Sequence, residues 1–278
     1  MATPHTHRIR TEVGSLEVLD TGGRRPVAVL WHSLFVDNRS WSRVQAELAV
    51  DRRLIMITGP GHGASGDPGR RYSMADCAAA SITVLDALGI AGPVDWLGNA
   101  WGGHVGILVA AGRPDRVRSL TTVGTPVHAY PRRKHTEIHL LLAVHRAVGP
   151  IRFLTGSVVD AMLSQHTRAT DPDAIAITAD GFREADRAGL RNAVVSISLR
   201  RPDLTPDLPR IQVPTLFITG ADHPDWSPEQ ARAAARLLRL GSTAVLDDAS
   251  YLGALEAPGE CVRIVREFWA RHDAALTA

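Results

Sequence analysis

Short, nearly continuous apolar runs recur along the chain, separated by segments with apolar residues at helical spacing. Strands are expected at 26–32, 53–59, 94–98, 117–124 and 213–220. Helices are expected between them, at 41–50, 74–88, 103–111 and 228–240. Apolar runs without alternation are typical of strands buried on both faces. Their alternation with helices predicts an α/β fold with a mostly parallel, doubly wound sheet, whose ligand site lies beyond the carboxyl ends of the strands.

The alternation of strand and helix stops in one long internal segment. Between residues 125 and 209 the pattern indicates about three helical segments with no strand-like run between them. We therefore predict that residues 1–124 and 210–278 form the core and that residues 125–209 form an inserted helical cap.

Charge and composition limit the classes of partner. Lys and Arg total 31 against 29 Asp and Glu, and the basic residues are scattered, so no nucleic-acid partner is expected. The sequence has no apolar run of about 18 residues and no secretory signal, which predicts no contact with a membrane and a cytoplasmic location. A small-molecule ligand or substrate is the expected partner, and a homodimer is left open.

Cysteines and histidines give little sign of a metal or redox centre. Cys77 and Cys261 lie in predicted helices and are expected to be buried apolar side chains. His135 and His139 are four residues apart on a predicted helix and could face one metal ion, with His145 further along. Because no carboxylate or thiolate partner has matching spacing, we expect a solvated helix, no metal and no cofactor.

Four motifs occur in an informative order. His32-Ser33-Leu34 follows a predicted strand; residues 60–65 read Pro-Gly-His-Gly-Ala-Ser, residues 98–102 read Gly-Asn-Ala-Trp-Gly, and residues 248–252 read Asp-Ala-Ser-Tyr-Leu. In these motifs the chain resembles the α/β-hydrolase fold family over nearly all of its length outside the predicted cap. The resemblance implies the α/β-hydrolase fold and places the nucleophile elbow at residues 98–102.

The catalytic positions that this resemblance implies carry changed residue types. Ala100 stands where the elbow serine is expected, and a methyl group cannot attack a carbonyl. The family's histidine aligns with Tyr251 and its acid with His223, although Asp222 or Asp225 could take the acid position instead. The resemblance therefore implies a degenerate triad without the serine hydrolase mechanism.

The backbone part of the implied site does not depend on a serine. By resemblance, the amides of Leu34 and Trp101 form an oxyanion hole, and the helix that begins near Trp101 adds its positive dipole end. An imidazolium at His223 could make the Tyr251 hydroxyl more acidic than its usual pKa near 10. We therefore hypothesise that Tyr251 moves a proton while the amides hold an enolate or oxyanion. In the alternative, Tyr251 fills vacated space and His223 is a turn residue.

An apolar pocket between cap and core is the expected ligand site. Its candidate ligand contacts are His32, Ser33, Phe35, Asn99, Asp222, Asp225 and Trp226. Three of them have a structural alternative: in the family the histidine at His32 usually supports the oxyanion loop, and Phe35 and Trp226 could belong to the core. His62 and His104 are expected to be structural.

Three functions remain open. The first is an enzyme acting on a small, largely apolar carbonyl compound by non-covalent acid/base and oxyanion chemistry, of the isomerase, cyclase or lyase type. The second is a catalytically silent ligand-binding protein. The third is an esterase-type hydrolase whose serine was engineered to Ala100, and only in that case would Ala100→Ser restore ester turnover.

Overall fold

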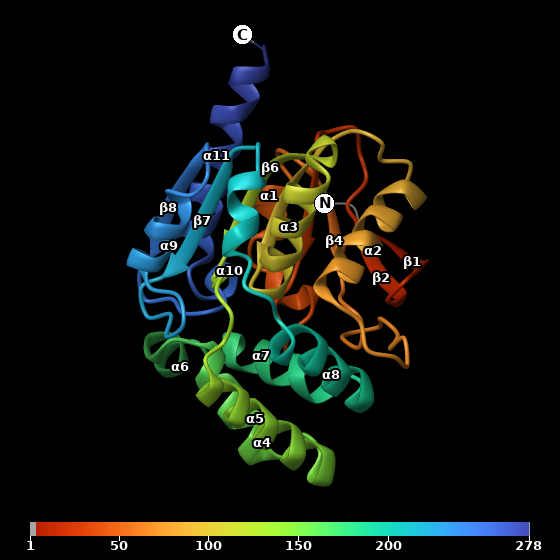
Figure 1. Cartoon of the computed structure of the whole chain (residues 1–278), viewed down its shortest axis with the longest axis vertical. Helices are drawn as coiled ribbons and strands as arrows, with labels where there is room; N and C mark the ends of the chain where they lie inside the picture. The colour runs from red at the N-terminus through yellow and green to blue at the C-terminus, as the bar shows by residue number, and fades with distance from the viewer. Residues whose placement is uncertain (1–3, 278) are drawn as a thin grey trace.

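A single sheet organises the molecule in the computed structural model, which describes residues 4–277 (Figure 1). Within that range the sheet is 8-stranded, with the order β1-β2-β4-β3-β5-β6-β7-β8. The strands are β1 (His5–Thr11), β2 (Gly14–Asp20), β3 (Val27–Trp31), β4 (Arg53–Ile57), β5 (Val94–Asn99), β6 (Val117–Val123), β7 (Thr215–Gly220) and β8 (Gly241–Leu246). From β4 to β8 neighbouring strands pair in parallel, and β1 and β2 pair antiparallel at one edge. The predicted mostly parallel α/β sheet is confirmed.

The strands that the sequence predicted and those it missed differ in burial. The five predicted runs coincide with β3, β4, β5, β6 and β7, of which β5 and β7 are buried along their whole length. β1 is half exposed and lies at the edge, and β8 at the opposite edge is only partly buried. Because edge strands carry no continuous apolar run, the pattern that found the central strands could not find these.

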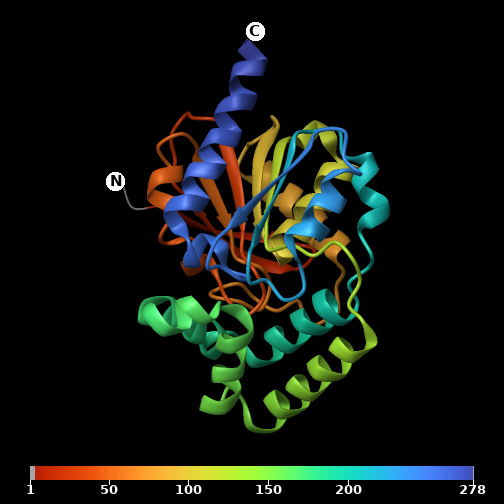
Figure 2. The ribbon, with the colours of Figure 1, turned by 90° about the vertical axis from the view of Figure 1, so that its left-hand side faces the viewer.

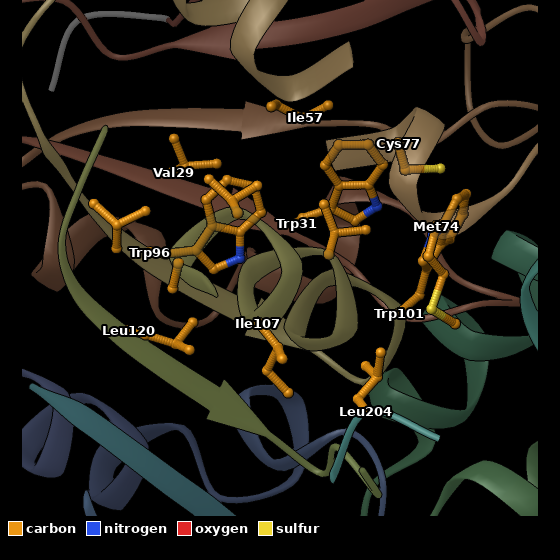
Figure 3. Close-up of a cluster of buried hydrophobic side chains, with 14 of the residues drawn as sticks. Val29, Trp31, Ile57, Met74, Cys77, Trp96, Trp101, Ile107, Leu120 and Leu204 are labelled. Atoms are coloured by element: carbon orange, nitrogen blue, oxygen red, sulfur yellow. The ribbon is translucent and has the colours of Figure 1, made fainter. Parts of the chain in front are cut away.

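Alternate residues of the central strands supply two cores. Val29 and Trp31 of β3 face helices α2 (Met74–Ala87) and α3 (Trp101–Gly112), where Trp96 and Trp101 also pack (Figure 3). Ala28 and Leu30 face the opposite way, toward α1 (Gln45–Leu48) and α11 (Pro258–Thr277). Helices therefore cover both faces of the sheet, as a doubly wound arrangement requires.

The segment between β6 and β7 is helical and lies at one end of the sheet (Figures 1 and 2). It contains α4 (Arg132–Val148), α5 (Arg152–Met162), α6 (Gln165–Thr170), α7 (Pro172–Glu184), α8 (Arg187–Ala193) and a π-helix (Val194–Leu199), and is followed by a 3-10 helix (Thr205–Arg210). The sequence indicated about three helical segments here, because short helices such as α6 and α8 contain too few turns to show a period. After β7 come α9 (Pro228–Ala235) and α10 (Gly253–Glu256). Of the helices in residues 4–277, none is both long and apolar enough to cross a bilayer.

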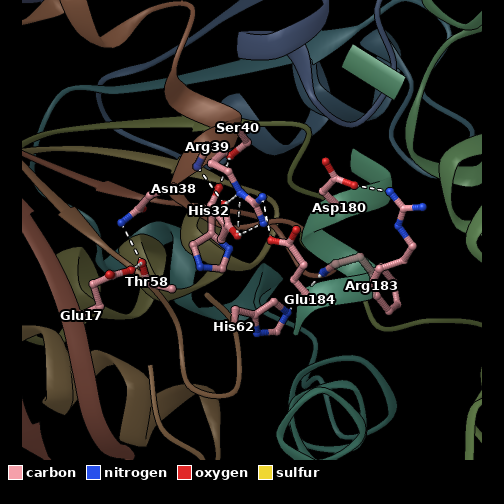
Figure 4. Close-up of polar contacts among 12 residues, drawn as sticks. Glu17, His32, Asn38, Arg39, Ser40, Thr58, His62, Asp180, Arg183 and Glu184 are labelled. Carbon is pink, nitrogen blue, oxygen red and sulfur yellow. Dashed lines mark hydrogen bonds and ion pairs between the residues drawn. The ribbon is translucent and has the colours of Figure 1, made fainter. Parts of the chain in front are cut away.

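Two ion pairs tie this helical segment to the loop after β3. Arg43 binds Asp171, the N-cap residue of α7, and also donates to the Leu255 carbonyl at 3.1 Å. Arg39 contacts Glu184 at the end of α7 at 2.8 Å (Figure 4). The helices that roof the carboxyl ends of the strands are thus fixed to the segment that follows His32-Ser33-Leu34.

Candidate functional site

A tight strand-to-helix turn forms the centre of the site. β5 ends at Asn99, α3 begins at Trp101, and Ala100 between them has φ 43° and ψ −98°, a backbone conformation rare for a residue other than glycine. The turn is closely packed: a Cβ on Gly98 would lie 2.2 Å from the Gly102 carbonyl carbon, and one on Gly102 would lie 1.9 Å from the Trp31 oxygen. The elbow is therefore formed, with a methyl group at its tip.

Two backbone amides next to the elbow are free to bind an anion. The N–H groups of Leu34 and Trp101 donate to no other residue in the described chain, and both residues line a cavity that Ala100 also lines. Trp101 is the first residue of α3, so its amide belongs to the unpaired, positive end of that helix. These amides can hold negative charge on a ligand oxygen.

Buried histidines hold the loop that carries Leu34. The Gly59 amide donates to His32 Nε2 at 2.8 Å, and His32 Nδ1 donates to the Ser33 carbonyl at 2.6 Å. The Phe35 amide donates to His62 Nε2 at 3.3 Å (Figure 4). Burial lowers the pKa of His32, and lowers that of His62 to about 3, so both rings stay neutral and can accept these bonds. His32 thus lies behind the loop and supports it.

Tyr251 lies in a chain of polar side chains from three segments. Its hydroxyl donates to the Asp225 carboxylate, which lies 3.1 Å from Lys134 Nζ of α4. Burial raises the pKa of Tyr251 well above its usual range, and the Asp225 carboxylate raises it further. Although burial opposes the change, the hydrogen bonds from Tyr251 and Lys134 hold the pKa of Asp225 below its ordinary value. This row of hydrogen-bonded side chains therefore consists of the neutral phenol of Tyr251, the carboxylate of Asp225 and the ammonium group of Lys134.

His223 lies beside Tyr251, with ring centroids 3.9 Å apart. Burial lowers its pKa to about 4, so the ring is neutral at neutral pH, and its Nδ1 accepts from the Asp225 amide at 3.2 Å. The sequence hypothesis required an imidazolium that lowers the pKa of Tyr251, and the structure gives the opposite direction. The reason is burial of both rings, which disfavours the charged form of each.

The cavity above Ala100 is small, about 60 Å³. Pockets for drug-sized ligands begin at about 300 Å³, so this one fits a functional group of a ligand. Its lining combines the loop after β3, the elbow, Tyr251 and the inserted helices: Ser33, Leu34, Phe35, Ala100, Trp101, His104, Tyr130, Met162, Ile197, Ser198, Arg201 and Tyr251. Part of this lining is the π-helix, a form that often occurs at functional sites.

The predicted ligand contacts divide into two groups. Ser33 and Phe35 line the cavity. The others lie outside its lining: His32, Asn99, Asp222, Asp225, Trp226 and the candidate acid His223. Asn99 Nδ2 donates to the Val123 carbonyl at 2.8 Å and the Tyr251 carbonyl at 2.7 Å, Asp222 is exposed, and Trp226 is buried against Phe217. Asp225 reaches the site through Tyr251.

Sequence reasoning missed two polar residues at the site, Arg201 and Lys134, and expected a third, His104, to be structural. Arg201 lines the cavity and is 7% exposed, with its guanidinium 3.8 Å from the centre of the Tyr130 ring. His104 Nε2 donates to the Pro126 carbonyl at 2.8 Å, which leaves the buried Nδ1 as an acceptor with no partner among the described residues. Lys134 contacts Asp225. No motif marked Arg201 or Lys134, because the fold of the inserted segment brings them to the site.

The residues considered for metal or redox chemistry lie elsewhere. His135 and His139 are both on α4, and in the described part of the chain no three His, Cys, Asp or Glu residues gather closely enough to hold a metal ion. Cys77 on α2 and Cys261 on α11 are buried and free, as expected of apolar side chains. Burial raises the pKa of Cys261 to about 12.

Comparisons with known proteins agree with this architecture. The sequence profile of the alpha/beta hydrolase family matches residues 28–264. The pyrrolizixenacetamide deacetylase of Xenorhabdus hominickii is 26% identical over 259 residues, which cover 90% of this chain and 93% of that protein. Among solved structures, a thermophilic esterase from Thermogutta terrifontis superimposes with a TM-score of 0.87 at 24% identity, covering 96% of this chain and 99% of the esterase. An enol-lactonase from Burkholderia xenovorans LB400 also gives 0.87 at 24% identity, over 95% of this chain and all of that chain.

Proposed function

This chain belongs to the alpha/beta hydrolase family, and from that premise we propose that it is an enzyme that acts on a small carbonyl compound without forming an acyl-enzyme. The observation that carries the proposal is the elbow itself. Ala100 provides no nucleophile, yet Leu34 and Trp101, whose amides are unpaired, still line the cavity beside it. A site that has these anion-binding amides and no nucleophile suits chemistry in which negative charge develops on a substrate oxygen.

The amides would act on the substrate's carbonyl oxygen. When a proton leaves the carbon next to a carbonyl, negative charge moves to the oxygen, and preorganised N–H donors stabilise that charge more than the neutral ground state. Most residues that line the cavity are buried, and several come from the inserted segment, so these donors act at lower dielectric than in water. Leu34 and Trp101 would therefore lower the barrier to enolate formation.

Tyr251 and Asp225 would move the proton. As the Tyr251 oxygen takes a proton from the substrate carbon, its own hydroxyl proton passes to Asp225, which already accepts that hydrogen bond. Return of the proton to another substrate atom restores both residues, so isomerisation, cyclisation or elimination needs no external base. Lys134 would keep Asp225 ionised between turnovers.

Silent ligand binding is the second candidate function, and one observation favours it. The Tyr251 hydroxyl is engaged by Asp225 and its pKa is raised, which makes Tyr251 a poor base on its own. A protein of this kind would bind the ligand in the same cavity and release it unchanged. The engineered-esterase hypothesis gains less support, because Tyr251 occupies the histidine position and the one imidazole lining this cavity, His104, binds a carbonyl instead of a carboxylate.

Exchange of carbon-bound protons tests the enzyme proposal directly. In D₂O, the wild-type protein should accelerate exchange of the protons next to the carbonyl of pyruvate or pentane-2,4-dione, followed by NMR. Tyr251→Phe should lower that rate by about 10²- to 10⁴-fold, the range for loss of a general acid or base. Tyr72→Phe is the matched control, because Tyr72 is buried away from the cavity and its hydroxyl has no partner within residues 4–277. Equal rates for Tyr251→Phe and wild type would reject the proposal, and binding without exchange would favour the silent binder.

A further inference from the structure

Arg201 differs from the other buried arginines of the described chain in having no carboxylate partner. Arg52, 4% exposed, contacts Asp95 at 2.6 Å and Asp273 at 2.7 Å, and Arg116, 6% exposed, contacts Asp86 at 2.8 Å. Arg201 is equally buried at 7% exposed, yet none of the ion pairs found within residues 4–277 includes it, and the Asp203 carboxylate attracts it only from beyond ion-pair distance. Burying an unpaired charge is costly, so such a residue calls for an anion that arrives from outside.

The guanidinium of Arg201 has hydrogen-bond donors to spare. Its Nη2 donates to the His128 carbonyl at 2.6 Å, whereas its buried Nε has no partner among the described residues. Its Nη1 lies 3.5 Å from His104 Nε2, but that nitrogen carries the proton given to the Pro126 carbonyl and cannot accept. Two nitrogens of this guanidinium, Nε and Nη1, therefore lack an acceptor, and Arg201 is one of the residues that line the cavity.

Nearby acidic groups are already engaged. Asp225 is neutralised by Lys134 and accepts from Tyr251, and the Asp203 carboxylate accepts from the Thr205 amide at 2.9 Å. The imidazoles of His104 and His128 are held neutral by burial and by the positive charge of Arg201. Asp203 and Asp225 lie outside the lining of the cavity, so Arg201 is the one charged residue among those that line it, together with Leu34 and Trp101, whose amides are free.

We propose that Arg201 binds a carboxylate of the ligand, so that the substrate class is a short oxo acid instead of an uncharged apolar carbonyl compound. Arg201, Leu34 and Trp101 line the same cavity of about 60 Å³, so the carboxylate and the carbonyl are separated by few atoms, as in 2-oxo and 3-oxo acids. A planar guanidinium matches a carboxylate in geometry and charge. Assigning the carbonyl to the amides rests on the proposed function, but the carboxylate contact does not require turnover.

A pair of probes of similar shape and different charge tests the proposal. Binding of pyruvate and of methyl pyruvate is followed by the fluorescence of the protein, in which Trp101 lines the cavity. The wild type should bind pyruvate about tenfold or more tightly than the ester, since a charge-assisted hydrogen bond is lost in the ester. Arg201→Met should abolish this preference, and Arg201→Lys should retain part of it because charge remains without the planar fork.

Arg200→Met is the matched control. It also removes one positive charge, but Arg200 precedes Arg201 in the chain and its side chain is exposed. It should leave the preference for pyruvate unchanged. Equal binding of pyruvate and its ester by the wild type, displacement of pyruvate by inorganic phosphate at similar concentration, or an equal loss in Arg200→Met would each overturn the carboxylate assignment. The wild-type comparisons decide the matter even if Arg201→Met fails to fold.

Failures of the two proposals are distinguishable. Charge-selective binding that depends on Arg201, without proton exchange, would retain this inference and reject the proposed function. The opposite outcome would reject this inference and retain the proposed function. In that outcome proton exchange of pentane-2,4-dione is lost in Tyr251→Phe but unaffected by Arg201→Met, and the protein binds the two pyruvate probes equally.

Discussion

The two sides of the cavity differ in the kind of functional group they present: backbone amides on one side and side chains on the other. On the elbow side the functional groups are backbone amides, placed by a turn that requires glycine at positions 98 and 102. On the other side, called the proton-transfer side for the function we propose, they are side chains from separate segments: Asp225 before α9, Tyr251 after β8 and Lys134 on α4. Substitution can change a side-chain network while the backbone keeps its path. The elbow can therefore persist in this family member although Ala100 gives it no nucleophilic hydroxyl.

The two sides are joined at one residue. Asn99, directly before the elbow, donates from Nδ2 to the Tyr251 carbonyl and so holds the Tyr251 backbone against the end of β5. Gly124 lies against the same region, where an added Cβ would come 2.8 Å from the Tyr251 carbonyl oxygen and 3.4 Å from His223 Nε2. The proton-transfer side is thus positioned through its backbone, and its side chains are the parts that can be exchanged.

The largest expected effect comes from the elbow. In Gly102→Ala the new Cβ would lie 1.9 Å from the Trp31 carbonyl oxygen, a clash with backbone atoms that no side-chain movement relieves. We therefore expect the free energy of unfolding to fall by about 4 kcal/mol or more, or the variant to fail to fold. Gly112→Ala at the end of the same helix is the control, because nothing lies within 4 Å of its new Cβ and it should be neutral or slightly stabilising. Denaturant unfolding measures both. Similar stabilities for the two variants would refute the claim that the elbow is tightly constrained.

The second prediction concerns the proton-transfer side, where the functional groups are side chains. Ala100→Ser alone should be labelled only slowly by a fluorophosphonate, because the neighbouring Tyr251 is a neutral phenol of raised pKa and cannot activate a serine. Ala100→Ser with Tyr251→His places an imidazole where Asp225 already accepts a hydrogen bond, so it should react about 10²-fold or more faster. Labelling rates followed by mass spectrometry compare the two variants. Rapid labelling of Ala100→Ser alone would instead indicate a relay lacking only its serine.

How far the sequence could predict this molecule follows the same division. Apolar runs predicted β3 to β7 because those strands are buried on both faces, and local motifs predicted the elbow because its turn is made by neighbouring residues. Arg201 and Lys134 were missed because their function depends on how the inserted helices pack onto the core. The pKa direction of Tyr251 was predicted wrongly because burial, which dominates it, is a property of the folded chain.

The third prediction uses the buried ring behind Tyr251. His223 has a pKa of about 4 when folded and about 6.5 when unfolded, so protons bind the unfolded chain more tightly and stability falls as pH drops from 6.5 to 4. The contribution to the free energy of unfolding lost over that window is about 3 kcal/mol. His223→Gln cannot titrate, so its stability should fall less steeply across the window. The two proteins should show parallel pH dependence above pH 7, and equally steep acid slopes would contradict burial of a neutral His223.

The smallest effect concerns how α4 holds the proton-transfer side. Lys134 and Asp225 are 31% and 23% exposed, so a double-mutant cycle of Lys134→Met and Asp225→Asn should give a coupling of at most about 1 kcal/mol, weakened by salt. The neighbouring pair Arg133 and Glu137 is the control: Arg133 is 91% exposed, and its coupling in the same measurement should be smaller. A coupling for Lys134 no larger than that of the control would mean that α4 does not hold Asp225. The inserted segment would then affect the site through its residues that line the cavity, among them Arg201 and Tyr130, and loss of Lys134 should leave Tyr251-dependent proton exchange unchanged.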